Sequence, residues 1–312
     1  MVTEQGSPET VAFVGVGTMG ALLSARLLAA GHPLRAYDPE AAALARAVAL
    51  GAHGADSPRD AAAGAEIVVL SLPSPEIVEE VVTGEDGVLA VLAPGGVIVD
   101  MSTIDPATTR RLAERATERG ASFLDAPVSG GVMRAETGEL TIMVGGDEAA
   151  LERCRPVLST LGTNIIRVGP SGSGQVVKLC NQVMVGIVVA GLAETLVTGA
   201  KAGVDARTVA EILSISAGGT WILENHMPLT TFADDYAARF SVDLLHKDVA
   251  LFGAMADEGR VPVPLAAGVA EALKAARGRG LGALDQTVLV RMYEELAGVR
   301  VLGGAEDQQE MR

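Results

Sequence analysis

The chain has 312 residues, a formal net charge of −15 and 49% hydrophobic residues, yet only 3% of its residues are aromatic. This length allows one large domain or two ordinary ones, each with a buried core. The negative charge argues against nucleic acid or an anionic membrane as a partner, because both are bound through basic patches. Two cysteines give no disulfide framework, and the polar start of the chain is unlike a signal peptide, so we expect a cytoplasmic protein.

The first predicted elements are a strand, a glycine-rich turn and a helix. Residues 11–14 are apolar and predict a buried parallel strand, and residues 21–31 predict a helix. The turn between them is formed by Gly15, Val16, Gly17, Thr18, Met19 and Gly20. In this G-x-G-x-x-G pattern the glycines permit a tight turn, close approach of a pyrophosphate and close packing of helix and strand. The pattern alone is weak evidence in a chain with 37 glycines, but its place between strand and helix predicts a dinucleotide site.

A second strand, residues 34–37, ends at Asp38, about 20 residues after the glycine-rich turn. An acid at this place hydrogen-bonds the adenosine ribose hydroxyls of a bound dinucleotide, and the alternative is an ordinary capping Asp before Pro39. A carboxylate here repels a 2′-phosphate, and no Arg follows it, so the sequence favours NAD over NADP. Arg35 lies on the strand and not at its tip, so we do not expect it to clamp a phosphate.

The alternation of strands and helices continues to residue 168. Strands are predicted at 66–72, 97–100, 122–124, 140–144 and 164–168, with helices from 106 and over 148–161. Doubly wound folds bind ligands outside the carboxyl ends of their strands, so Leu72 and Pro73 are candidate cofactor contacts. Residues 169–172 form a breaker cluster, which predicts a boundary between a dinucleotide-binding domain, 1–170, and a second domain, 171–312.

A second glycine-rich loop lies between the last predicted strands, at residues 125–131. Ser129, Gly130 and Gly131 offer a hydroxyl and closely approachable backbone N–H groups, which suits the binding of an anion such as a carboxylate. The alternative is a plain glycine-rich turn, which the spacing alone favours.

The second half of the chain is predicted to be helical. Apolar runs of helical length occur at 173–200, 206–215, 244–257, 262–277 and 284–297, and no convincing strand follows residue 170. The first run is apolar nearly all round, which is typical of a core helix, and its charged and amide residues argue against a membrane span.

That helix carries an unusual polar face. Lys178, Asn181 and Gln182 are three and four residues apart, so one amine and two amides share a face of an apolar helix. A buried Lys is costly without a function or a partner. The alternative is a structural Lys that reaches water along its apolar stem.

Other polar residues of the second half give weaker signals. An exposed ion pair is the plain interpretation of Lys247 and Asp248, and Trp221 belongs either to a core or to a pocket wall. No group of His, Cys, Asp or Glu has metal-ligand spacing, so we predict no metal site.

Four motifs occur together and in order: FVGVGTMG at 13–20, DAPVSGG at 125–131, GSGQVVKLCNQ at 172–182, and the pair at 247–248. In this combination the chain resembles the β-hydroxyacid dehydrogenase family over nearly its whole length. The resemblance implies a Rossmann dinucleotide-binding domain, an all-α C-terminal domain and a long helix that joins them. The stretches FSVDLLHKD and GLGALDQTVLVRMYEEL are most similar to the tartronate semialdehyde reductases of this family.

The resemblance also implies roles for residues. Lys178 matches the general acid/base, and the 129–131 loop matches the segment that holds the substrate carboxylate. Many members have Asn at both the third and the fourth position after the Lys, whereas this chain has Asn181 and Gln182, so either amide is a candidate for the substrate oxygen. Thr103 and Lys247 match residues near the cofactor. The family also implies a homodimer or homotetramer.

The implied reaction interconverts a small β-hydroxy acid and its semialdehyde. Hydride transfer belongs to the cofactor, while the protein orients the substrate and manages the proton. Burial lowers the pKa of a Lys toward neutrality, which suits a reversible acid/base. The alternatives are a 3-hydroxyisobutyrate or other β-hydroxyacid dehydrogenase, an imine reductase, and a non-catalytic dinucleotide-binding protein. The presence of Lys178 counts against the last two.

Overall fold

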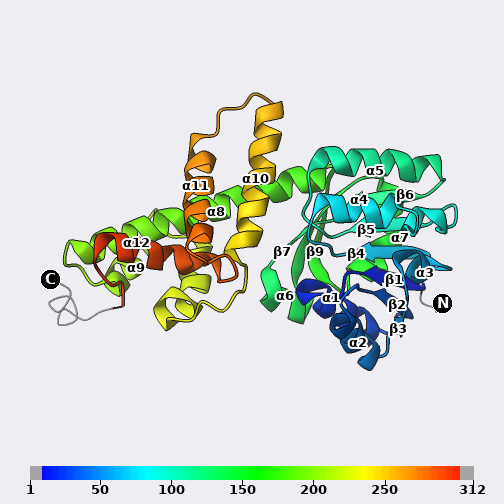
Figure 1. Cartoon of the computed structure of the whole chain (residues 1–312), viewed down its shortest axis with the longest axis horizontal. Helices are drawn as coiled ribbons and strands as arrows, with labels where there is room; N and C mark the ends of the chain where they lie inside the picture. The colour runs from blue at the N-terminus through cyan, green and yellow to red at the C-terminus, as the bar shows by residue number, and fades with distance from the viewer. Residues whose placement is uncertain (1–8, 303–312) are drawn as a thin grey trace, which may run out of the picture. The chain divides into compact units, whose positions relative to one another are not determined.

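The computed structural model describes residues 9–302, which form two compact units that divide between Lys178 and Leu179 (Figure 1). The division falls inside one long helix, α8 (Ser173–Lys201). The sequence boundary at residue 170 lies just before this helix. The first turn of α8 belongs to the first unit because it packs closely on the sheet: a Cβ atom at Gly174 would lie 2.4 Å from the backbone oxygen of Met143.

The first unit is built on a nine-stranded sheet with the strand order β3-β2-β1-β4-β5-β6-β8-β7, and β9 pairs with β8. Strands β1 to β6 are parallel neighbours, while β8 runs antiparallel to β6 and β7. The strand order reverses beside β1, which has β2 on one side and β4 on the other. The strands are β1 (Val11–Val14), β2 (Leu34–Tyr37), β3 (His53–Gly54), β4 (Ile67–Leu70), β5 (Val97–Asp100), β6 (Ser122–Asp125), β7 (Val128–Ser129), β8 (Leu140–Gly145) and β9 (Gly162–Gly169).

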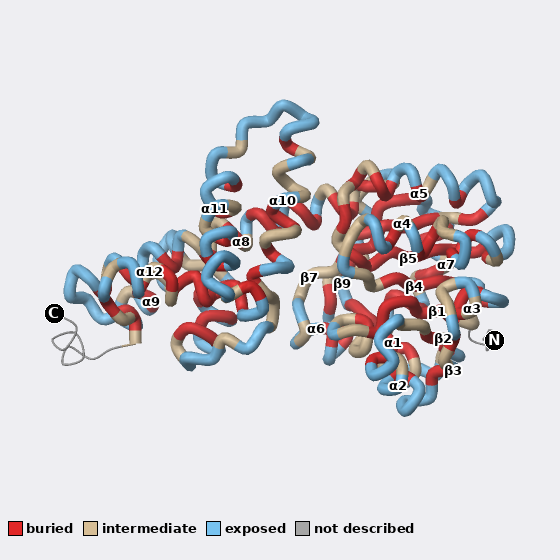
Figure 2. The backbone as a smooth tube through the Cα atoms, viewed as in Figure 1, coloured by how far each residue is buried: buried red, intermediate tan, exposed pale blue. Residues whose placement is uncertain are grey.

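Helices cover both faces of this sheet, because alternate residues of the central strands enter two separate cores. Val11 and Phe13 belong to one core, whereas Ala12 and Val14 belong to the other. The central strands β1, β4 and β5 are buried (Figure 2). Helices α1, α2 and α7 contribute to the first core and α3, α4 and α5 to the second. The helices of this unit are α1 (Thr18–Ala29), α2 (Ala41–Ala49), α3 (Pro58–Ala62), α4 (Pro75–Thr83), η1 (Val88–Ala90), α5 (Pro106–Glu118), α6 (Gly131–Thr137) and α7 (Glu148–Leu158).

The second unit is helical, and its described residues contain no strand, only an isolated bridge between Ser241 and Asp285. The predicted fold class, a Rossmann domain followed by a helical domain, is confirmed. Besides the rest of α8, the elements are α9 (Ala206–Ser214), η2 (Ile222–His226), η3 (Met227–Leu229), η4 (Thr231–Ala233), α10 (Val242–Glu258), α11 (Pro264–Gly278), η5 (Gln286–Val288) and α12 (Leu289–Ala297).

One buried carboxylate organises the irregular part of this unit. Asp285 accepts hydrogen bonds from His226 Nε2 at 2.9 Å and from the backbone N–H groups of Arg239 and Phe240. Burial alone would raise the pKa of Asp285, but the hydrogen bond and charge of His226, together with the hydrogen bonds from Thr287, hold the pKa below its usual value. The segment between α9 and α10, whose only regular elements are the short turns η2, η3 and η4, is therefore tied to the start of η5.

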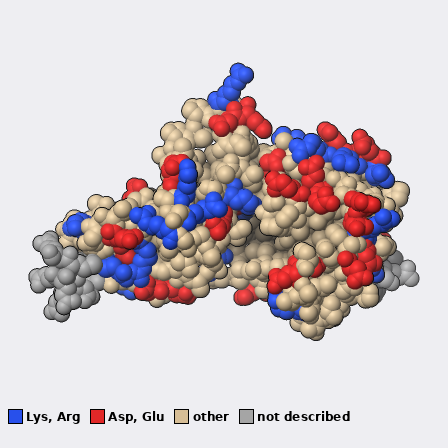
Figure 3. Space-filling view, viewed as in Figure 1, with Lys and Arg blue, Asp and Glu red and all other residues tan. Residues whose placement is uncertain are grey.

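Helix α8 is long and apolar enough to cross a membrane by length and composition, but half of its most apolar window (50%) is buried within the protein. It also carries three buried polar side chains, those of Gln175, Lys178 and Gln182. We therefore interpret α8 as a core helix. Acidic and basic side chains both occur on the visible face of each unit (Figure 3).

Candidate functional site

The predicted cofactor residues of the first unit lie at one edge of the sheet. Each follows the carboxyl end of a parallel strand, and the carboxyl ends of parallel strands meet at the same edge. The glycine-rich turn follows β1, Asp38 follows β2, Leu72 and Pro73 follow β4, and Thr103 follows β5. The Ser129 loop follows β6, the next parallel strand.

The glycine-rich turn is a close-packed structure with one open side. Gly15 has φ +92°, and a Cβ there would lie 2.3 Å from the backbone oxygen of Ser71. A Cβ at Gly20 would lie 1.9 Å from the backbone oxygen of Gly15, so the helix can approach the turn only without a side chain. At Gly17, by contrast, a Cβ would have no neighbour within 4 Å. The turn is therefore open at the glycine where a pyrophosphate is expected to approach.

The start of α1 is also suited to an anion. Gly17 is the N-cap residue, offers no side-chain hydrogen bond, and no acidic residue follows it in the first turn. Other helices of this unit begin with a side chain that accepts a backbone N–H, namely Ser57, Ser74, Asp105 and Asp147. The first N–H groups of α1 are thus left for a phosphate, which fits a dinucleotide here.

Asp38 is attached to the same turn. Its Oδ2 accepts a hydrogen bond from the N–H of Val16 at 2.8 Å, and its Oδ1 accepts one from the N–H of Glu40 at 2.9 Å. A carboxylate oxygen has further lone pairs, so Asp38 can still accept from ribose hydroxyls. Arg35 is turned to another partner: its Nη2 lies 2.8 Å from Asp60 Oδ1. Asp38 is therefore held beside the turn, and the positive charge of Arg35 is paired with Asp60 and not with Asp38.

The segments after β4 and β5 are tied together. The N–H of Leu72 donates to Ser102 Oγ at 2.9 Å, and the N–H of Ser102 donates to Asp100 Oδ1 at 3.0 Å. Ser102 is buried, while Thr103 and Leu72 are partly exposed at the edge of the sheet. One hydroxyl therefore sets the spacing of two loops that the sequence assigned to the cofactor.

The loop after β6 brings the carboxylate-binding candidates to the same edge. Ser129 lies on β7, opposite Thr141 of β8, and is half-buried. Gly130 has φ +131°, a conformation that favours glycine, and α6 begins at Gly131. The predicted glycine-rich turn is thus the connection between a short strand and a helix, and it presents the Ser129 hydroxyl beside closely approachable backbone.

Asp125, at the end of β6, holds the start of α8. Its two carboxylate oxygens accept from the N–H groups of Gly172 at 2.8 Å and Gln175 at 3.0 Å. Burial raises the pKa of Asp125 to about 6, although the same hydrogen bonds favour the charged form. Lys178 follows Gln175 by one helical turn and is 7% exposed. The first turn of α8 therefore lies at the ligand-binding edge, and Lys178 follows it closely.

In the second unit, a chain of polar groups joins α8 to α10. Asn181 Nδ2 donates to Gln182 Oε1 at 3.1 Å, and Gln182 Nε2 donates to Asp248 Oδ2 at 2.8 Å. Lys247 Nζ lies 3.0 Å from Asp248 Oδ1, and the Asp248 side chain is 3% exposed. The pair at 247–248 is therefore half-buried, and the interpretation as an exposed ion pair was wrong.

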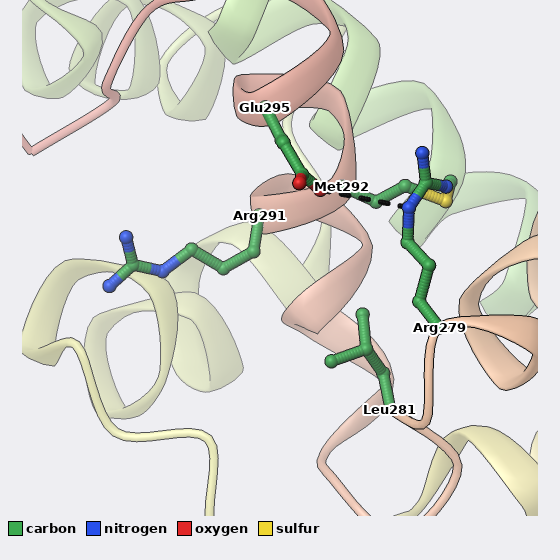
Figure 4. A pocket seen from close by; sticks show the side chains of 5 residues that line it. All are labelled: Arg279, Leu281, Arg291, Met292 and Glu295. Atoms are coloured by element: carbon green, nitrogen blue, oxygen red, sulfur yellow. Dashed lines mark ion pairs between the residues drawn. The ribbon is translucent and has the colours of Figure 1, made fainter.

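Other features of the second unit lie apart from these residues. Trp221 is half-exposed, with 51% of its surface accessible. A pocket beside α12 is lined by the pair Arg279 and Glu295, 3.6 Å apart, with Arg291 extending away from them (Figure 4). It contains none of the predicted site residues. Within residues 9–302, no three His, Cys, Asp or Glu side chains are grouped to hold a metal ion.

Comparison with known proteins identifies two family matches that cover most of the chain. Residues 10–169 match the NAD binding domain of 6-phosphogluconate dehydrogenase, and residues 172–293 match the NAD-binding domain of NADP-dependent 3-hydroxyisobutyrate dehydrogenase. The chain belongs to the β-hydroxyacid dehydrogenase family. It is an oxidoreductase whose cofactor is NAD.

Individual relatives and one solved structure are similar to this chain over nearly its full length. A 2-(hydroxymethyl)glutarate dehydrogenase of Eubacterium barkeri is 40% identical over 94% of this chain and 98% of its own. An NAD-dependent L-serine dehydrogenase of Pseudomonas aeruginosa is 37% identical over 92% and 99%. The structure of Mycobacterium tuberculosis 3-hydroxyisobutyrate dehydrogenase with L-serine has a TM-score of 0.86 at 33% identity, covering 92% of this chain and 99% of that one.

Asp125 and Gln175 were not singled out from the sequence, and Asp248 was noted only as the ion-pair partner of Lys247. All three lie inside the quoted motifs, but their hydrogen bonds join segments 47 to 73 residues apart. A signal existed for Gln175, because a glutamine one turn before a buried Lys in an apolar helix also needs a partner.

Proposed function

We propose that the protein interconverts a 2-(hydroxymethyl) carboxylate and its semialdehyde with NAD, and that its substrate is tartronate semialdehyde, which it reduces to glycerate. The relatives named above act on or hold 2-(hydroxymethyl)glutarate, serine and 3-hydroxyisobutyrate. Each of these has a hydroxymethyl group on the carbon that bears the carboxylate. They differ only in the third substituent, which is a hydroxyl in glycerate.

Lys178 is the proposed general acid/base. Bound NAD supplies the hydride acceptor in oxidation, and NADH supplies the hydride donor in reduction. In reduction, the protonated amine of Lys178 gives its proton to the carbonyl oxygen, and in oxidation the neutral amine takes the proton of the hydroxymethyl group. The observation that carries this role is the burial of Lys178, which is 7% exposed as a residue, one turn from the ligand-binding edge.

The Ser129 loop is proposed to bind the substrate carboxylate. Its support is its place after β6, at the edge that also carries the glycine-rich turn. A hydroxyl and glycine backbone N–H groups can donate to a carboxylate without a fixed positive charge. A bound carboxylate holds the hydroxymethyl carbon at a fixed distance from the reacting carbon of NAD. Such positioning contributes a large part of the rate acceleration in reactions of this kind.

The third substituent distinguishes the two candidate substrates. Two amides follow Lys178 on its helix, the exposed Asn181 and the buried Gln182. An amide can hydrogen-bond a hydroxyl substituent but not the methyl group of 3-hydroxyisobutyrate, so these residues favour the hydroxyl. The names of the relatives favour 3-hydroxyisobutyrate as the second candidate.

A substrate panel tests the proposal. The panel is measured on one preparation. With NADH it tests the reduction of tartronate semialdehyde and of an imine. With NAD it tests the oxidation of glycerate, 3-hydroxyisobutyrate, L-serine and 2-(hydroxymethyl)glutarate. We expect kcat/KM in the glycerate pair to exceed the others by at least about tenfold. A higher kcat/KM with 3-hydroxyisobutyrate would replace this substrate by the second candidate.

We also propose that the chain forms a homodimer or homotetramer. Its support is the apolar surface of α8, where Val177 and Met184 are 39% and 56% exposed. A monomeric mass by light scattering at micromolar concentration would contradict it.

A further inference from the structure

Gln175 is a fully buried glutamine on the first turn of α8, three residues before Lys178. Both ends of its side-chain amide are hydrogen-bonded to backbone. Nε2 donates to the oxygen of Ser102 at 2.9 Å, and Oε1 accepts from the N–H of Ile104 at 3.2 Å. These two backbone groups lie on either side of Thr103, so one side chain fixes the chain around that residue.

The backbone of the same glutamine is fixed as well. Its N–H donates to Asp125 at the end of β6, and Asp125 also holds Gly172. Ser102, on the other side, accepts from the N–H of Leu72. One buried network therefore connects the segments after β4, β5 and β6 with the start of α8.

We propose that Gln175 is a positioning residue that sets the place of Lys178 relative to the cofactor-binding segment around Thr103. The inference rests on the proposed function, which gives Lys178 the proton transfer. A neutral amide presents a donor and an acceptor at a fixed separation, which an apolar side chain of similar size cannot do. Without it, the buried oxygen of Ser102 and N–H of Ile104 lose their partners, and the segment must shift to find others.

Three variants test this role, each compared with the wild type at the same pH. Gln175→Leu removes both hydrogen bonds. Gln175→Glu can keep both while its carboxyl group is protonated, but an ionised carboxylate cannot donate to Ser102. Gln286→Glu is the matched control, because Gln286 is another buried glutamine, 3% exposed, on η5 of the second unit. Asp125 and other ionisable groups are present in all of these proteins, so the ratio to wild type is the quantity of interest.

We expect Gln175→Leu to lower kcat by about 10- to 100-fold, the size of a misplacement on the order of 1 Å. Its NADH dissociation constant, from a fluorescence titration without substrate, should rise several-fold. For Gln175→Glu the ratio of kcat to wild type should approach one near pH 5 and fall as the pH rises to about 8.5. The ratio for Gln286→Glu should stay level over the same range.

The proposal is overturned if folded Gln175→Leu keeps both kcat and the NADH dissociation constant within about twofold of wild type. It is also overturned if pH changes only the melting temperature of Gln175→Glu, whereas kcat and NADH binding of the folded variant follow those of wild type. If Gln175→Leu does not fold, the pH profile of Gln175→Glu decides. Failure of the proposed function looks different: the wild type would bind NADH but turn over no member of the panel, and the NADH titration would still test Gln175.

Discussion

The carboxylate of Asp38 accepts a hydrogen bond from the backbone N–H of Val16 at 2.8 Å. The residue that ends the second strand thus holds the turn that follows the first. We expect the same carboxylate to act in cofactor binding in two ways: it supports the glycine-rich turn, and it places a negative charge where NADP would carry a 2′-phosphate.

Replacing Asp38 by Ser should therefore relax the choice between the two cofactors. The wild type is expected to have a higher kcat/KM with NAD than with NADP. In Asp38→Ser the NAD value should fall, because the turn loses a support, while the NADP value rises, because the repulsion is gone. Steady-state kinetics with both cofactors measure this. A wild type that uses NADP as well as NAD, or better, would contradict the assignment.

The glycines of the turn give a matched pair of variants. Gly17→Ala should leave the melting temperature near wild type but weaken NADH binding, since the new methyl group meets no protein atom within 4 Å and enters the space assigned to the cofactor. Gly20→Ala should lower the melting temperature, because its Cβ would lie 1.9 Å from the oxygen of Gly15. Normal NADH binding by Gly17→Ala would show that the pyrophosphate lies elsewhere.

Ser129→Ala should raise KM for the carboxylate substrate and leave KM for NAD unchanged. A hydrogen bond to a charged group is worth about 1.5 to 3 kcal/mol, so the increase in KM should be roughly 10- to 100-fold. Ser122→Ala is the control, since Ser122 begins β6 at the opposite end of the strand from the loop. Unchanged KM values for both ligands in Ser129→Ala would remove the loop from the substrate site.

Asp125 gives a pH dependence of stability. Burial raises the pKa of its carboxyl group from 3.8 to about 6 in the folded protein. Between these values the folded state binds the proton and the unfolded chain does not. The contribution of Asp125 to the free energy of unfolding is therefore highest at low pH and falls as the pH rises from 3.8 to about 6. Above pH 6 this contribution is about 3 kcal/mol lower than at low pH.

Asp125→Asn isolates this effect, because its amide does not titrate. The free energy of unfolding of wild type minus that of Asp125→Asn, from urea titrations, should decrease as the pH rises from about 4 to 6 and then level off. Loss of one acceptor in the variant adds an offset that does not depend on pH. A difference that is constant over this range, or that increases with pH, would be inconsistent with the raised pKa.

Much of this fold follows from local sequence patterns. The strands 11–14, 34–37 and 97–100 occur at the predicted residues, because continuous apolar runs bounded by turn residues specify buried parallel strands. Helices α2, α3, α4 and α6 were not predicted. For α6 the reason is physical: its glycines indicated a turn, and the packing of Ala135 in the core, which favours a helix there, depends on the tertiary fold.

The sequence could predict which residues belong to the candidate site, but not the hydrogen bonds that connect them. The spacing of Lys178, Asn181 and Gln182 on one helix is a local property, so sequence could indicate it. The bonds from Gln175 to Ser102 and from Gln182 to Asp248 depend on the tertiary fold. For the same reason Asp248 was taken to be exposed, although it is buried between Lys247 and Gln182.

The measurement that tests the account most directly is made on Lys178→Ala, with turnover, NADH binding and melting temperature taken from one preparation. Turnover should fall by about 100- to 10,000-fold, the usual contribution of a positioned proton donor. NADH binding should persist, and the variant should be no less stable than wild type, because a buried amine is costly to keep. Lys201→Ala, at the exposed end of the same helix, should retain wild-type turnover. A near-normal rate for Lys178→Ala, with a lower melting temperature, would mean that this lysine supports the fold and that the proton is transferred by another group.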